Sequence, residues 1–99
     1  MRNQVRIEGV ARRVEPVRYT PAGIPVLSFE LEHESKQQAG GFERAVRCVI
    51  SAQMVGTEAP QTAPQLEGNT VCVDGFLAAK SLRNPRLVLH VQHVELIKV

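Results

Sequence analysis

The sequence has little of what marks secreted, membrane-bound or catalytic proteins. It contains no tryptophan, one tyrosine, three phenylalanines and two cysteines in 99 residues. No apolar run approaches the roughly 18 residues that cross a bilayer. The first residues mix charged and apolar side chains, which argues against a secretion signal. These absences favour one small domain, residues 1–99, working in the cytoplasm without a membrane partner.

Familiar catalytic and metal-binding patterns are missing as well. The sequence has no G-x-S-x-G motif, phosphate-binding loop or G-x-G-x-x-G motif. His90 and His93 fall on opposite faces of one expected strand, and His33 lies in phase with apolar residues, as a core histidine would. Cys48 and Cys72 lie in Val/Ile-rich runs without a CxxC pair, which predicts buried free thiols. We therefore expect a binding protein, not an enzyme, with no cofactor and no metal.

Alternation of apolar and polar side chains is the strongest structural signal that the sequence does contain. Period-two alternation is typical of half-buried strands. It predicts five of them, over residues 5–14, 27–34, 42–51, 70–79 and 86–98. Gly9 suggests a bend in the first strand, and a change of phase predicts a bulge near Gln92 in the last.

The segments between these strands differ in character. Residues 35–41 are polar and end in a glycine pair, which predicts a loop. Residues 52–68 contain Pro60 and Pro64 and show no sustained periodicity of apolar residues. We therefore expect this segment to cross over to the next strand with at most a short helical turn. Five strands without repeats indicate a small all-β barrel or sandwich.

The position of the basic residues carries the functional signal, because a net charge of +2 is too small to do so. In an oligonucleotide-binding (OB) fold, the face of strands 2 and 3 and the loops joining strands 1–2 and 4–5 bind the ligand. Eight of the twelve basic side chains would map there: Arg12, Arg13, Arg18, Arg44, Arg47, Lys80, Arg83 and Arg86. Ordinary surface charge explains the same placement equally well, so both interpretations stay open at this point.

Aromatic and acidic residues refine this interpretation. Single strands are held by bases that stack on rings in a positive groove. Tyr19 and Phe42 are the candidate stacking rings, and Phe42 is equally well explained as a core residue at a barrel end. Glu30, Glu32 and Glu34 line one strand face, which we interpret as solvated and not as an acid–base site.

Seven short motifs follow one another along the chain. They are Asn3-x-Val5-x-Ile7-x-Gly9, Arg18-Tyr-Thr-Pro21-Ala-Gly23-Ile-Pro25-Val, Phe29-x-Leu31-Glu32-His33, Gly41-Phe42-x-Arg44, Val73-x-Gly75-Phe76, Val88-Leu89-His90 and Val94-Glu95-Leu96-Ile97. In order and spacing they resemble the bacterial single-stranded-DNA-binding proteins and, more closely, the related primosomal replication protein N (PriB) family. The resemblance covers nearly the whole chain, with the weakest fit over residues 54–67.

This resemblance implies an OB-fold homodimer that binds single-stranded DNA at stalled replication forks. It also implies two protein partners, the primosomal restart helicase and a helicase-loading factor. By position, the DNA contacts would be Arg18, Phe42, Arg44, Lys80, Arg83 and Arg86. Two positions depart from the pattern that the resemblance implies: Arg47 stands where an aromatic residue is expected, and Glu34 where a basic one is. We expect these departures to give a weaker and more electrostatic grip on DNA.

Our first expectation is a non-enzymatic adaptor that dimerises through the strand at residues 3–14, since pairing removes an exposed sheet edge. The second is a general single-stranded-DNA-binding protein, although the long Gly/Pro-rich acidic tail common in such proteins is not seen here. The third is a module that contacts only protein. A small hydrolase has no support in the sequence.

Overall fold

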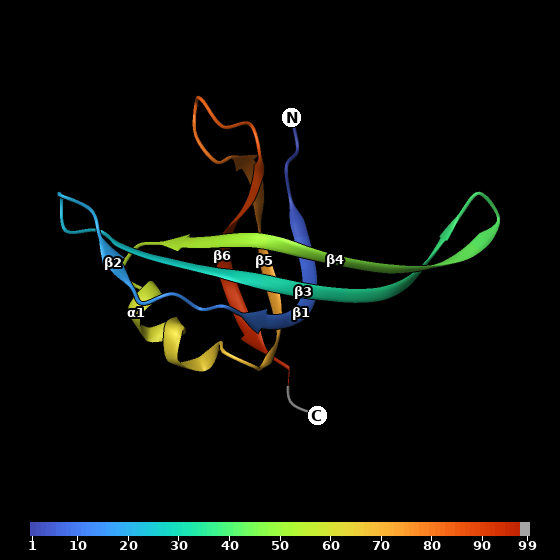
Figure 1. Ribbon diagram of the computed structural model, residues 1–99, viewed down its shortest axis with the longest axis horizontal. Coiled ribbons are helices and arrows are strands. Elements are labelled where there is room, and N and C mark those ends of the chain that lie inside the picture. Colours follow the sequence, from blue (N-terminus) through green and yellow to red (C-terminus); the bar gives the residue numbers. More distant parts are fainter. Residues whose placement is uncertain (98–99) are drawn as a thin grey trace.

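The computed structural model describes residues 1–97 and consists mainly of long strands (Figure 1). A short helix and a 3-10 turn lie between the fourth and fifth strands. The elements in chain order are β1 (Val5–Arg12), β2 (Arg18–Tyr19), β3 (Pro25–Ala39), β4 (Phe42–Val55), α1 (Ala59–Thr62), η1 (Ala63–Gln65), β5 (Thr70–Ala79) and β6 (Leu87–Leu96).

Five of the strands close into a barrel. The sheet order is β1-β5-β6-β4-β3-β2, and β1 also pairs with β3, which joins the two sides of the sheet. All pairings are antiparallel except β4 with β6, where Ala52 lies opposite Leu89. A five-stranded closed barrel of this kind is the OB-fold arrangement, so the prediction of an all-β five-stranded barrel is confirmed.

The core lies inside the barrel and follows from the alternation of the strands. Leu27, Phe29 and Leu31 of β3 point inward and are buried, as the sequence pattern predicts. Ala59 and Leu66, from the segment that carries α1 and η1, are fully buried in the same cluster. The expected crossover thus contains only a short helical segment, which packs against the barrel core.

Two irregularities in the strands allow the barrel to curve. A Cβ atom at Gly9 or Gly75 would collide with the backbone of a neighbouring strand, at Glu32 and His90 respectively, so only glycine fits there. Asp74 pairs with His93 while Gly75 pairs with Val91, which leaves Gln92 as the extra residue of a bulge. The predicted bulge near Gln92 is thus confirmed.

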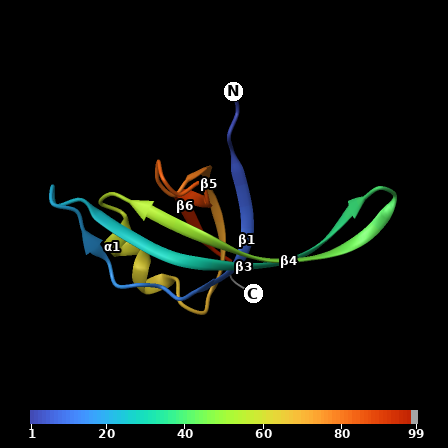
Figure 2. The same cartoon turned by 45° about the horizontal axis from the view of Figure 1, so that its top comes forward.

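The predicted loop over residues 35–41 is wrong. Residues 35–39 continue β3 and pair with residues 42–46 of β4, so only Gly40 and Gly41 form the turn. Both glycines have positive φ, 63° and 83°, as two-residue hairpin turns of this hand require. The hairpin leaves the barrel as a long arm (residues 35–46), visible in Figures 1 and 2. Backbone pairing with β4 outweighs the polar character of these side chains.

Other strand limits shift for local reasons. β1 ends at Arg12 instead of residue 14, because Arg13 has a φ of 51°, which a strand does not contain. β4 continues four residues past Ser51, to Val55, by pairing with β3. The predicted last strand reached Lys98, which lies outside the described residues; within them β6 ends at Leu96.

The two cysteines differ in environment. Cys72 is a buried free thiol, and burial raises its pKa. Cys48 is exposed, so the prediction of a buried thiol is wrong for it. It lies opposite His33, two residues from the arm, where fewer core side chains are available to cover it. In residues 1–97, no helix is long and apolar enough to cross a membrane.

Candidate nucleic-acid interface

The outer face of β3 and β4 is the surface where an OB barrel receives its ligand. Because β3 alternates, Glu30, Glu32 and Glu34 point away from the core-facing row of Leu27, Phe29 and Leu31. Glu34 lies directly opposite Arg47 of β4, and Glu32 lies opposite Val49. This face therefore presents a row of carboxylates where a cationic surface was expected.

Each carboxylate of the row is paired with an arginine. The Nε atom of Arg12 lies 3.1 Å from an oxygen of Glu32, and that of Arg13 lies 3.4 Å from Glu30. The Nε atom of Arg47 lies 3.1 Å from an oxygen of Glu34. We call these six residues the paired sheet face.

The acidic row is at least partly exposed, as predicted, but its pairing was missed. Three arginines assigned to DNA thus already have an anionic partner within the chain. The spacing of the glutamates was visible in the sequence, whereas the register that brings the arginines to them was not.

The loop between β5 and β6 has the opposite character. Lys80, Arg83 and Arg86 form no ion pair within residues 1–97. The backbone N–H of Lys80 donates to the carbonyl of Arg86 (2.8 Å), and the Oδ1 atom of Asn84 accepts from the N–H of Arg86 (3.1 Å). These bonds shape a closed turn, which we call the cationic loop (residues 80–86); it projects from the barrel in Figure 1.

Arg18 and Tyr19 lie together on β2, at the edge of β3. Tyr19 has 62 % of its surface exposed, as a stacking ring requires. The turn beyond it is held by Thr20, whose hydroxyl accepts a hydrogen bond from the N–H of Ile24 (3.1 Å). Arg18 forms no ion pair with any described residue. This end of the barrel therefore presents an exposed ring and an exposed cation on consecutive residues of β2.

Phe42 and Arg44 lie at the far end of the arm. Phe42 is 74 % exposed, so its alternative interpretation as a core residue is wrong. Successive side chains alternate along β4, which places Phe42 and Arg44 on one face of the arm and Arg47 on the other. The structure thus separates the predicted binding residues into the paired sheet face, the cationic loop, β2 and the arm, instead of gathering them on one surface.

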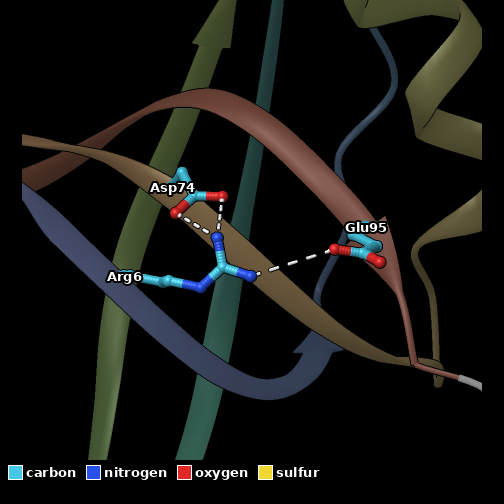
Figure 3. Close-up of polar contacts among 3 residues, drawn as sticks. All are labelled: Arg6, Asp74 and Glu95. Atoms are coloured by element: carbon cyan, nitrogen blue, oxygen red, sulfur yellow. Dashed lines mark hydrogen bonds and ion pairs between the residues drawn. The ribbon is translucent and has the colours of Figure 1, made fainter.

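Arg6 belongs to a charged cluster that the sequence interpretation did not include. Its Nη1 atom donates to both carboxylate oxygens of Asp74, at 2.9 and 3.0 Å, and its Nη2 atom lies 3.9 Å from Glu95 (Figure 3). These residues come from β1, β5 and β6 respectively. The hydrogen bond and charge of Asp74 raise the pKa of Arg6. The cluster links three strands, and Arg6, like the arginines of the paired sheet face, already has an anionic partner within the chain.

Metal chemistry has no site in the described part of the chain. Among residues 1–97, no group of three or more His, Cys, Asp or Glu side chains is arranged to hold a metal ion. The arrangement instead provides exposed cations on the β5–β6 loop and exposed rings on β2 and at the tip of the arm, which is chemistry suited to binding a polyanion.

Comparison with known proteins agrees with this geometry. Residues 3–93 match a family model described as another single-strand binding protein family. The replication restart protein PriB of Neisseria meningitidis serogroup B is 40 % identical over 93 residues, which cover 94 % of this chain and 92 % of that protein.

Solved structures show the same fold. The structure of PriB from Ralstonia solanacearum has a TM-score of 0.84 at 26 % identity, covering 97 % of this chain and 98 % of that one. The single-stranded DNA binding protein from Thermus aquaticus has a TM-score of 0.77 at 24 % identity, covering 97 % of this chain and 50 % of that one, which supports the fold alone. From the family model and the full-length likeness to replication restart proteins, the chain belongs to the PriB family of single-strand binding-like OB proteins.

Proposed function

We propose that this chain is a non-enzymatic adaptor that binds single-stranded DNA during replication restart in the cytoplasm. One observation carries the proposal: strand β2 and the cationic loop, which border the binding face of an OB barrel, hold four cations without an ion-pair partner among the described residues. They are Arg18, Lys80, Arg83 and Arg86. Exposed cations at these positions are available to phosphates, and Tyr19, next to Arg18 in the sequence, offers an exposed ring.

On this proposal the binding unit is a single OB domain, and its protein partners are the primosomal restart helicase and a helicase-loading factor. The relatives it matches are named as replication restart proteins, which supports a role in replication restart. The arm, with Phe42 and Arg44 at its tip, extends well beyond the barrel (Figure 2). It would extend the DNA contact away from the cationic loop.

We further propose that the functional form is a homodimer paired through β1. Residues 5–9 of β1 pair with β5 on one side, while β3 pairs only with residues 10–12, so part of the other edge has no strand partner within residues 1–97. An unpaired edge readily accepts a second strand. A groove of about 490 Å³ lies along this edge, between Ile7 and His33. Sedimentation at micromolar protein should give the dimer mass, and a monomer mass would rule this form out.

One alternative is favoured by a specific observation. The paired sheet face carries as many carboxylates as arginines, which reduces its attraction for DNA. A module that contacts only protein is therefore the second candidate. General coating of single strands is the third candidate, since residues 3–93 match a single-strand binding protein family model.

A titration with a labelled oligodeoxythymidine at about 50 and 200 mM salt separates these candidates. A DNA-binding adaptor should bind at the lower salt and lose affinity at the higher one, with a log–log slope of roughly −0.7 for each phosphate contacted. Absence of binding at the lower salt would reject the proposal in favour of the protein-only module. The restart helicase should then be tested for binding in the presence and absence of the oligonucleotide.

A further inference from the structure

An aromatic pair lies on the barrel away from the paired sheet face. The rings of Phe76 on β5 and His90 on β6 are stacked, with centroids 5.1 Å apart and planes within 4° of parallel. The two residues are direct cross-strand partners, and both are only partly buried. Neither belongs to the binding residues described so far, and both stand on rigid strands instead of on a loop.

The surroundings of this pair connect it to the proposed DNA path. His90 is paired with Gln53 of β4, so Gln53, His90 and Phe76 form a row across three strands. Lys80 and Arg86 lie just beyond the ends of these strands, in the cationic loop, four residues from Phe76 and His90 respectively, or about 13 Å along an extended chain. Their backbones are hydrogen-bonded to each other at the base of the cationic loop. The ring pair and two cations without an ion-pair partner among the described residues therefore belong to one β5–β6 hairpin.

A groove adjoins the two rings. It has a volume of about 430 Å³, and its lining includes Gln53, Glu58 and Gln92 as well as Phe76 and His90. This volume lies in the range of roughly 300–1,000 Å³ typical of ligand sites. The amides of Gln53 and Gln92 each supply donors and an acceptor, which match the edges of a nucleobase. Glu58 accepts hydrogen bonds but repels phosphate, so the groove suits a base and the cationic loop suits the backbone.

We propose that Phe76, His90 and this groove form a second base-stacking site, which holds a base of single-stranded DNA while Lys80 and Arg86 contact its phosphates. The inference rests on the proposed binding of single-stranded DNA and extends the path from the β3–β4 face onto β5 and β6. The occupant is a base because a flat ring pair flanked by amides offers stacking and edge contacts together. Stacking of this kind accepts every base.

The absence of tryptophan from the chain provides a direct test. In Phe76→Trp, all tryptophan emission reports on this site. Oligodeoxythymidine should quench it, with a midpoint equal to that of the same oligonucleotide, labelled, measured by anisotropy. Gln65→Trp, at an exposed position on η1, is the matched control and should show no quenching. Unchanged emission from Phe76→Trp while the labelled oligonucleotide binds would overturn the site.

A second variant tests the energetic contribution. Phe76→Leu keeps an apolar side chain and removes the ring, so affinity for the oligonucleotide should fall about five-fold or more with an unchanged melting temperature. An unchanged affinity, or an effect only on binding to a protein partner, would reject the site. If the wild-type chain itself fails to bind the labelled oligonucleotide, it is the proposed function that fails, which the anisotropy measurement detects independently.

Discussion

The paired sheet face and the cationic loop each contribute three basic side chains, yet their electrostatic states are opposite. On the sheet face, Arg12, Arg13 and Arg47 each lie within 3.4 Å of a carboxylate oxygen. On the loop, Lys80, Arg83 and Arg86 lack an ion-pair partner among the described residues. The position of a cation within a fold therefore does not by itself tell whether it is available to a ligand.

The difference also suggests an order of events in binding. Unpaired cations attract phosphates over a Debye length, about 8 Å at physiological salt. The arginines of the paired sheet face must first exchange their carboxylate partner for a phosphate. Exposed ion pairs are typically worth only about 0.2–1 kcal/mol, so this exchange is possible but contributes little net affinity. We expect the loop to supply most of the electrostatic attraction and the sheet face to act mainly as a surface of low net charge.

The largest effect should come from removing the loop cations. Changing Lys80, Arg83 and Arg86 together to Ala should flatten the log–log salt slope by about two units and lower affinity at low salt on the order of a hundred-fold. The loop is shaped by backbone bonds and Asn84, so the fold should persist. Oligonucleotide titrations over a range of salt concentrations measure the slope.

The matched control is the triple change of Arg12, Arg13 and Arg47 to Ala. It removes the same number of charges but from ion pairs, so its slope should change by less than about one unit. Equal flattening by the two triple variants would show that the sheet arginines leave their glutamates for DNA. The cations of the sheet face and those of the loop would then be equally available to DNA, contrary to the proposed difference.

A smaller effect of opposite sign should follow from removing the competing carboxylates. Changing Glu30, Glu32 and Glu34 together to Gln leaves three arginines without partners on the OB binding face. Binding should tighten about ten-fold at low salt, and the slope should steepen by up to about two units as these arginines engage phosphates. Thermal unfolding should change only slightly, because exposed ion pairs stabilise weakly. Unchanged affinity would place the DNA away from this face.

The barrel itself could be predicted because its cause is local. Alternation alone identifies Leu27, Phe29 and Leu31 as core residues, and a phase change locates the bulge at Gln92. The arm could not be predicted in this way, because residues 35–39 are polar and become a strand only through pairing with β4. A strand that covers no core needs no apolar side chains, so its sequence shows no alternation by which it could be recognised.

The site was harder to predict for the same reason. The basic residues of the loops are visible in the sequence, but the pairing of Arg12 with Glu32 joins residues of two strands whose register is set by the whole barrel. The stacking of Phe76 on His90 likewise depends on the register of β5 and β6. Residue type predicts which chemistry is present, whereas only the register tells which groups are already satisfied.

The smallest effect concerns a single pair on the sheet face. Arg47 stands where the family resemblance places a ring, and stacking one base on a ring is worth roughly 1–3 kcal/mol. In this structure Arg47 is 81 % exposed and held by Glu34, so Arg47→Trp should gain stacking but leave Glu34 as an uncompensated charge facing the DNA. Adding Glu34→Gln removes that repulsion, so the double variant should bind several-fold more tightly than wild type, and the single variant should fall between the two. Labelled-oligonucleotide titrations of the three proteins at one salt concentration measure this order. If the double variant binds more weakly than wild type, Arg47 already contacts DNA in preference to Glu34, and the sheet face takes part in binding as directly as the cationic loop.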